Sequence, residues 1–207
     1  MALVDRVKNI LLSPRAEWAV IDAEPATVAS LYTGYILPLA AIPVVCSAIG
    51  NSLIGVSIPF IGGHYKVPIV TALISGAVLY CFTLIGVFIM ALVADALAPS
   101  FGGTKSQVQA LKAVAYAYTA SWVGGILSLI PPLSVIGILF ALYSLYLLYI
   151  GLSMMMKVPQ DKAIGYTLVV IICCIVISVV LVFAVGALGF GMAGMAGAAS
   201  GAGNYRP

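Results

Sequence analysis

Ionisable side chains that could take part in chemistry are few in this sequence and stand at the edges of its apolar segments. Asp95 and Lys112 lie at the two ends of a polar connection, and Glu24 precedes the first long apolar segment. An acid at such an edge is either a solvated or ion-paired boundary residue or a site for protons or cations. For Asp95 we favour a structural pair with Lys112 or a solvated boundary, and the functional role stays open.

Tyrosine hydroxyls give two neighbouring apolar segments a polar character. Hydroxyls on facing helices hydrogen-bond to one another at about 0.6–2 kcal/mol each, which is the interpretation that we favour. The alternative is a polar cavity for a lipid headgroup or small solute, to which carbonyls freed by Pro38 and Pro43 would contribute. The hydroxyls in question belong to Tyr116, Tyr118, Thr119 and Ser121 in the third span and to Tyr143, Tyr146 and Tyr149 in the fourth.

Catalytic and metal chemistry find little support. The sequence has no HExxH motif and no nucleophile-to-base spacing, and the one histidine, His64, has no second ligand nearby. We therefore predict neither an enzyme nor a metal or cofactor site. The carboxylates Glu17, Asp22 and Glu24 are instead expected to form salt bridges between the leader and the loops. The expected partners are Arg15, Lys112, Lys157 and Lys162.

The composition shows what kind of protein carries these side chains. Of 207 residues, 63% are hydrophobic and 7% are charged, whereas a soluble domain has about 25% charged residues. Nine scattered basic and six acidic residues give a net charge of only +3, so a nucleic-acid partner is not expected. The four cysteines all lie in apolar runs, which indicates no disulfide framework.

Long uncharged blocks predict an all-α polytopic membrane bundle with about five transmembrane helices, since one crossing needs about 20 apolar residues. Pro131 and Pro132 resist helix continuation and divide one block into two spans. A tight loop with Pro99, Gly102 and Gly103 connects the second and third spans. The first span is followed by a hairpin-like loop. The uncharged blocks cover residues 25–65, 67–94, 113–156 and 163–205, and the continuous spans are expected at 31–49, 69–94 and 164–188.

The first 24 residues are amphipathic rather than spanning. We expect two short helices on the membrane surface, the second beginning at Ser13 and Pro14 and placing Trp18 in the headgroup layer. A disordered leader and a segment packed under the bundle as a plug are the alternatives. In the first helix the predicted apolar face is Leu3, Val4, Val7, Ile10 and Leu11, opposite Asp5, Arg6, Lys8 and Asn9.

Basic residues set the expected orientation. With the N-terminus in the cytoplasm, seven of them lie on the cytoplasmic side and only Lys66 and Arg206 on the other. Five crossings then place the C-terminus outside. The resulting division is a leader at 1–28, a five-span domain at 29–190 and a flexible Gly/Ala-rich tail at 191–207.

The order of these features resembles the bacterial branch of the Yip1-domain family. The resemblance implies a five-span bundle in the bacterial inner membrane with a role in membrane organisation. Eukaryotic relatives bind Rab-type GTPases, but the eukaryotic Asp-Leu-Tyr-Gly-Pro signature and a long polar N-terminal region are absent here, so GTPase binding is not expected. The matching segments are Ser13-Pro14 with Trp18, Glu24-Pro25, Ile36 to Leu39, Asp95 to Gly103, Lys112 to Thr119, Ile130 to Pro132, Tyr143 to Tyr146 leading into Gly151-Leu152, and Val158 to Ala163.

Two functions remain open at this level. The favoured one is a noncatalytic, Yip1-type role in membrane organisation or trafficking-like processes through helix, lipid or partner contacts, with membrane lipids, a second copy of the chain or another membrane protein as partners. The alternative is a small transporter or channel for an ion or small solute, with a path past Asp95 and Tyr116. No span carries a charge near its middle, which favours the first function.

Overall fold

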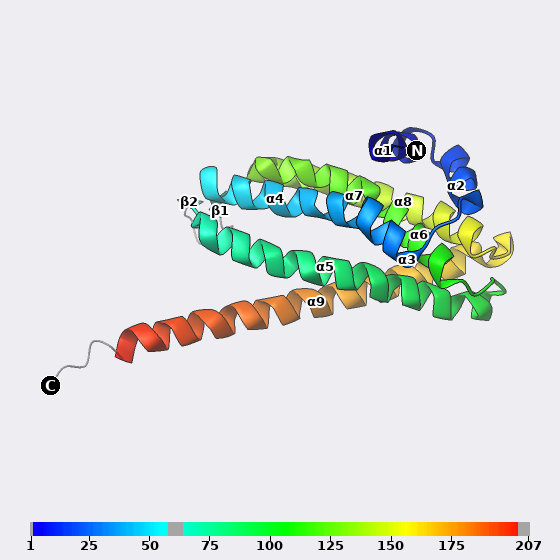
Figure 1. Cartoon of the computed structure of the whole chain (residues 1–207). Coiled ribbons are helices and arrows are strands. Elements are labelled where there is room, and N and C mark those ends of the chain that lie inside the picture. Colours follow the sequence, from blue (N-terminus) through cyan, green and yellow to red (C-terminus); the bar gives the residue numbers. More distant parts are fainter. Residues whose placement is uncertain (1, 58–63, 203–207) are drawn as a thin grey trace.

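The computed structural model describes residues 2–57 and 64–202, with side chains placed in 2–55, in 66–180 and at 183. Four helical segments are long and apolar enough to cross a membrane: Val28–Leu53, Ile69–Phe101, Pro131–Met155 and Gln160–Val180. A further crossing runs from Gln107 to Leu129 in shorter helical pieces. The predicted all-α bundle of about five spans is confirmed (Figure 1).

The leader forms helices α1 (Leu3–Leu12) and α2 (Pro14–Ala23). In Figure 1, α1 is seen nearly end-on while the long helices run across the view, so α1 lies across the bundle axis. Helix α1 contacts α7 and α2 contacts α8. Ile10 and Trp18 are fully buried there and Ile21 almost so. The leader therefore packs on the bundle, and the expectation that Trp18 lies in the headgroup layer is wrong, because its side chain is buried inside the protein.

The predicted faces of α1 need one correction. Val4, expected on the apolar face, is 72% exposed, and Arg6, expected on the polar face, is only 5% exposed. The buried stripe runs from Leu3 through Arg6 and Val7 to Ile10, which is ordinary helical spacing. A cation is tolerated in this stripe because carboxylates of the leader meet it there.

The first span is not a regular helix. After a capping box between Thr27 and Ser30, α3 (Val28–Leu31) passes into a π-helical turn, η1 (Tyr32–Ile36), and then into α4 (Leu37–Leu53). Pro38 lies in the first turn of α4, where a missing N–H costs little. A π-turn inside a helix often marks a functional region, and this one carries Tyr35.

At the end of the bundle far from the leader, β1 (Val56–Ser57) pairs with β2 (His64–Tyr65) in an antiparallel hairpin. This pairing agrees with the hairpin-like loop expected after the first span. Residues 58–63 and the side chain of His64 lie outside the described part of the chain.

Helix α5 (Ile69–Leu97) ends in a short 3-10 turn, η2 (Ala98–Phe101), followed by Gly102 with φ +78°. The Gly103 N–H donates to the Ala98 carbonyl at 2.9 Å. A Cβ on Gly103 would lie 2.7 Å from the Met156 carbonyl oxygen. The loop is therefore pressed against the link between α8 (Gly137–Met155) and α9 (Gln160–Ala202).

The third crossing is broken into α6 (Gln107–Ala117), α7 (Thr119–Gly124) and the 3-10 turn η3 (Gly125–Leu129). Ile130 is extended, and η4 (Pro131–Ile136) then leads into α8. The paired prolines thus lie in the turn between two spans. Helix α9 includes the expected last span and continues through residues 191–202 of the expected tail, and residues 203–207 lie outside the description.

Glycines set the spacing between crossings. A Cβ on Gly124 would lie 2.5 Å from Cγ of Phe140, and one on Gly125 would lie 2.5 Å from Cβ of Pro43. Both glycines therefore pack inside the bundle, where small residues permit close approach of helices.

Candidate functional site

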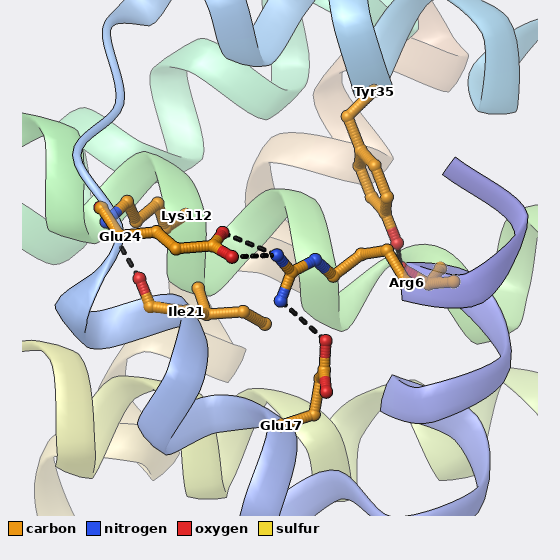
Figure 2. Close-up of polar contacts among 7 residues, drawn as sticks. Arg6, Glu17, Ile21, Glu24, Tyr35 and Lys112 are labelled. Carbon is orange, nitrogen blue, oxygen red and sulfur yellow. Dashed lines mark hydrogen bonds and ion pairs between the residues drawn. The ribbon is translucent and has the colours of Figure 1, made fainter. Parts of the chain in front are cut away.

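A buried cluster of charges joins the leader to the bundle (Figure 2). Nη1 of Arg6 donates to Oε1 of Glu17 at 2.5 Å, and Nη2 of Arg6 donates to both carboxylate oxygens of Glu24. The Arg6 and Glu17 side chains are 6% and 7% exposed, whereas that of Glu24 is 42% exposed. One guanidinium thus links two carboxylates, one buried and one open to the surroundings.

The three charged residues come from three successive pieces of the leader. Helix α1 supplies Arg6, α2 supplies Glu17, and Glu24 stands where α2 ends in extended backbone. Pro25 favours this extended conformation in the residue before it. The local sequence therefore turns the chain so that both acids can reach one base.

The neighbouring carboxylates keep Arg6 charged. Burial alone would lower the pKa of its guanidinium, but the hydrogen bond to Glu24 and the negative charges of Glu24 and Glu17 outweigh burial and raise the pKa above its ordinary value. Arg6 therefore acts as a permanent cation that holds the leader together.

Lys112 extends the cluster into the bundle. Its Nζ donates to the carbonyl oxygens of Ile21 at 2.9 Å and Glu24 at 2.5 Å (Figure 2). These carbonyls stand at the C-terminal end of α2, where a helix lacks donors and a cation is favourable. Next to it, Nε2 of Gln109 donates to Oδ1 of Asp22 at 2.9 Å. The third crossing therefore holds the end of α2.

The expected pairing of Asp95 with Lys112 is wrong, because Lys112 binds the leader instead. Asp95 is 6% exposed, so it is not a solvated boundary residue either. Its Oδ1 has no hydrogen-bond partner among the described residues. The hydroxyl of Tyr166 donates to the adjacent carbonyl of Ala94 at 2.7 Å rather than to the carboxylate.

Beneath the charges lies a layer of aromatic rings. The centre of the Tyr116 ring lies 4.4 Å from the centre of the Tyr35 ring. It lies 6.2 Å from the centre of the Trp18 ring, and these two rings meet edge to face. Cζ of Arg6 stands 5.8 Å from the centre of the Tyr116 ring. The rings and the cation thus form one continuous cluster.

Two helix irregularities meet at this layer. The hydroxyl of Tyr35, from the π-turn of the first span, is 2.7 Å from the Thr119 hydroxyl. Thr119 is the first residue of α7, directly after the break at Tyr118. This buried hydrogen bond joins the two discontinuous spans.

The expected hydroxyl bonding between the third and fourth spans occurs at Ser121, whereas the contacts that the structure describes for the tyrosines lie elsewhere. Tyr118 stacks on Trp122 at 5.8 Å, and the Tyr143 hydroxyl donates to the Leu11 carbonyl of the leader at 2.7 Å. Tyr146 is 43% exposed and lies against the Tyr143 ring. The hydroxyls of Ser121 and Ser144, 2.8 Å apart, link the two spans.

Cavities lie beside this region in the described part of the chain. One of about 220 Å³ lies between leader and first span and is mainly polar, and one of about 330 Å³ lies across the Glu24–Ala26 link beside Lys112. An apolar cavity of about 260 Å³ lies between the third crossing, α8 and α9. The first is lined by Arg6, Glu24, Ser30, Gly34, Tyr35 and Tyr116, among others.

A sequence profile of the Yip1 domain matches residues 8–182 of this chain. The chain belongs to the Yip1-domain family. It is similar to the inner membrane protein YohC of Escherichia coli strain K12, with 27% identity over 192 residues that cover 91% of this chain and 98% of the relative. YohC of an O6:H1 strain of the same species matches to the same extent. No solved structure matches the chain. The Yip1 resemblance is thus confirmed, and the protein is an integral membrane protein of that family.

Sequence reasoning missed several members of the cluster. Arg6 was placed on the solvent face of α1, although it follows Leu3 by three residues and precedes Ile10 by four, which puts it on the buried stripe. Tyr35 and Thr119 carried no sequence sign of their pairing, because it depends on a π-turn and a helix break. Within the described residues, no three potential metal ligands converge.

Proposed function

We propose that this Yip1-family protein has a noncatalytic role in membrane organisation, exerted through contacts of its leader with lipid and with partner proteins. The observation that carries the proposal is the way the leader is held. Its inner face is fixed to the bundle by Lys112, which donates to the Ile21 carbonyl, and by Tyr143, which donates to the Leu11 carbonyl. Arg6 and Glu17 join α1 to α2. Its outer face displays Val4 and Leu12, both more than two-thirds exposed, beside the exposed bases Lys8 and Arg15.

An outer face of this kind suits the headgroup layer of a membrane. Apolar side chains enter the boundary with the acyl chains, while bases are attracted to anionic headgroups at about 1 kcal/mol each. Because α1 lies across the bundle axis, this face can run along the membrane plane (Figure 1). A leader fixed in this way would give the bundle a permanent surface for lipid and protein contacts.

The orientation belongs to the same proposal. We infer that the leader end of the bundle faces the cytoplasm of a bacterial inner membrane, the location that the name of YohC gives for that relative. Seven basic residues belong to the leader end and its loops, against Lys66 at the other end of the described part of the chain. This asymmetry is the usual mark of the cytoplasmic side.

One observation favours a second function, that of a small transporter or channel. Asp95 is buried, and no residue that the structure describes gives its Oδ1 a hydrogen bond. Buried acids of membrane proteins often mark proton or ion paths. Asp95 lies near the end of α5 rather than at its middle, which makes this the weaker candidate.

A reconstitution experiment separates the two. Purified protein in liposomes should pass no protons, Na⁺, K⁺ or Cl⁻ above the leak of empty liposomes, and in giant vesicles it should redistribute a fluorescent anionic phospholipid. The double change Lys8→Glu and Arg15→Glu should remove the redistribution. Ion flux that Asp95→Asn abolishes, without lipid redistribution, would overturn the proposal in favour of transport.

A further inference from the structure

The 220 Å³ cavity between the leader and the first span has the form of a binding site for one small polar group. Helix α1 supplies Arg6, the extended link supplies Glu24, the π-turn supplies Gly34 and Tyr35, and α6 supplies Tyr116. Figure 2 shows Glu24 approaching the Arg6 guanidinium from the link while Tyr35 descends from the first span. Four separate elements therefore converge on one polar space.

The charges around this cavity favour a cation. One cation, Arg6, meets two carboxylates, Glu17 and Glu24. Of these three charged residues, Arg6 and Glu24 line the cavity. Both Nη groups of Arg6 are already directed at carboxylates, so Arg6 has little capacity left for an anion. The surplus negative charge reaches the cavity through Glu24, because its side chain is 42% exposed whereas that of Glu17 is 7% exposed.

The groups that face the cavity also specify the kind of cation. A carboxylate offers about four lone-pair positions, and Arg6 occupies only part of those on Glu24. A primary ammonium can donate N–H groups to the remaining positions, whereas a quaternary ammonium has none to donate. The rings of Tyr35 and Tyr116 line the same space and add attraction between cation and ring.

The place of the cavity points to a lipid as the source of the ammonium. It lies beside Ser30 and Leu31, where the first crossing begins, which is the level of lipid headgroups. A Cβ built on Gly34 would meet nothing within 4 Å. Gly34 therefore leaves an open entrance on the exposed side of the first span, along which acyl chains can lie.

We propose that this cavity binds the primary ammonium headgroup of a phospholipid, with phosphatidylethanolamine as the probe. The inference builds on the proposed function because it names a lipid that the leader region recognises. Its test measures which lipid stays bound, a quantity independent of ion flux and of anionic-lipid redistribution.

The test uses full-length protein equilibrated in nanodiscs of phosphatidylethanolamine, phosphatidylcholine and phosphatidylglycerol, in equal amounts with the same acyl chains. The protein is then extracted in mild detergent, and its retained lipid is quantified by mass spectrometry. The ratio of retained phosphatidylethanolamine to each of the other two lipids should be roughly tenfold higher than in the bilayer, the size expected of one charge-assisted hydrogen bond. Free phosphoethanolamine at millimolar concentration should displace little of it, because the acyl chains contribute to binding.

Two variants and one control make the result specific. Gly34→Leu fills the open entrance and should reduce retention to the bilayer share, and Glu24→Gln should do the same by removing the acceptor charge. Gly137→Leu is the control, because Gly137 also has open space around it but lies away from the cavity. Thermal unfolding of Gly34→Leu should match that of the unmodified chain, since leucine favours a helix over glycine.

Three outcomes would overturn the inference. They are equal retention of the three lipids, preferred retention of phosphatidylcholine or phosphatidylglycerol, and a phosphatidylethanolamine preference that survives Gly34→Leu. Ready displacement by phosphoethanolamine would assign the site to a free amine rather than a lipid. None of these outcomes would affect the liposome test of the proposed function.

Discussion

Arg6 and Glu17 form an ion pair with an N to O separation of 2.5 Å, and both side chains are more than nine-tenths buried. Such a pair adds little stability over an apolar replacement of both partners, but the loss of one partner leaves a buried charge uncompensated. The pair joins α1 to α2, and Lys112 joins α2 to α6. The leader is thus part of the folded bundle rather than an appendage.

The first prediction concerns the order of stability losses in this cluster. Arg6→Ala should cost about 3–5 kcal/mol because it strands the buried Glu17 carboxylate. Glu24→Gln should cost less, since its side chain is 42% exposed and water can replace the lost partner. Thermal unfolding in detergent measures both, with the exposed Lys8→Ala as control. An Arg6→Ala variant as stable as Lys8→Ala would contradict the burial argument.

The second prediction concerns the hydrogen bond between Tyr35 and Thr119. A double-mutant cycle with Tyr35→Phe and Thr119→Val should give a coupling free energy of about 0.6–1.7 kcal/mol, the range found between membrane helices. Tyr146→Phe serves as control, because Tyr146 is exposed, and it should show no coupling to Thr119→Val. Additive single changes would mean that the two irregular spans are not joined at this point.

The third prediction concerns the packing of the Trp18 ring against α8. A Cβ on Gly151 would lie 2.6 Å from the Trp18 ring atoms Cζ2 and Cη2. Gly151→Val should therefore push the ring out of its site and shift its fluorescence to longer wavelength, measured in a Trp122→Phe background. Gly137→Val introduces the same side chain into open space and should leave the emission unchanged. An unshifted spectrum for Gly151→Val would show that Trp18 does not pack on α8.

The fourth prediction concerns the other end of the bundle. A Cβ on Gly50 would meet the backbone carbonyls of Ser128 and Leu129, which cannot move aside as a side chain can. Gly50→Ala should destabilise the protein by about 1–3 kcal/mol through overpacking. Gly137→Ala should be neutral or slightly stabilising by thermal unfolding. Equal stability of the two variants would place α4 farther from η3 than the structure does.

Sequence patterns predicted the crossings well because their cause is local. Segment length, the absence of charge and the Pro131–Pro132 pair each depend on nearby residues, and the structure confirms an all-α bundle of about five spans. The hairpin after the first span had the same basis in the interruption near Gly50 and in Pro59. Family membership followed from the order of such local features along the chain.

The charged and aromatic cluster could be predicted only in part, because its contacts join residues that lie far apart in the sequence. Glu24 and Lys112 were singled out, but the distance that separates Lys112 from Ile21 in the chain conceals their hydrogen bond. Asp95 was expected to pair with Lys112 because a single loop separates them in the sequence. In the folded chain Lys112 binds the leader instead. Arg6 was missed because a charged residue was assigned to solvent by type, although its spacing placed it on the buried stripe.

Amide hydrogen exchange of the leader in nanodiscs tests most directly whether Arg6 joins α1 to α2 and helps to hold the leader on the bundle, where its guanidinium faces the Tyr116 ring. In the unmodified chain the amides of α1 and α2 should be protected, with those of α2 comparable to those of α6. In Arg6→Ala they should exchange much faster while α5 stays unchanged, and Lys8→Ala should behave like the unmodified chain. A leader whose amides exchange equally fast with and without Arg6 would contradict the account.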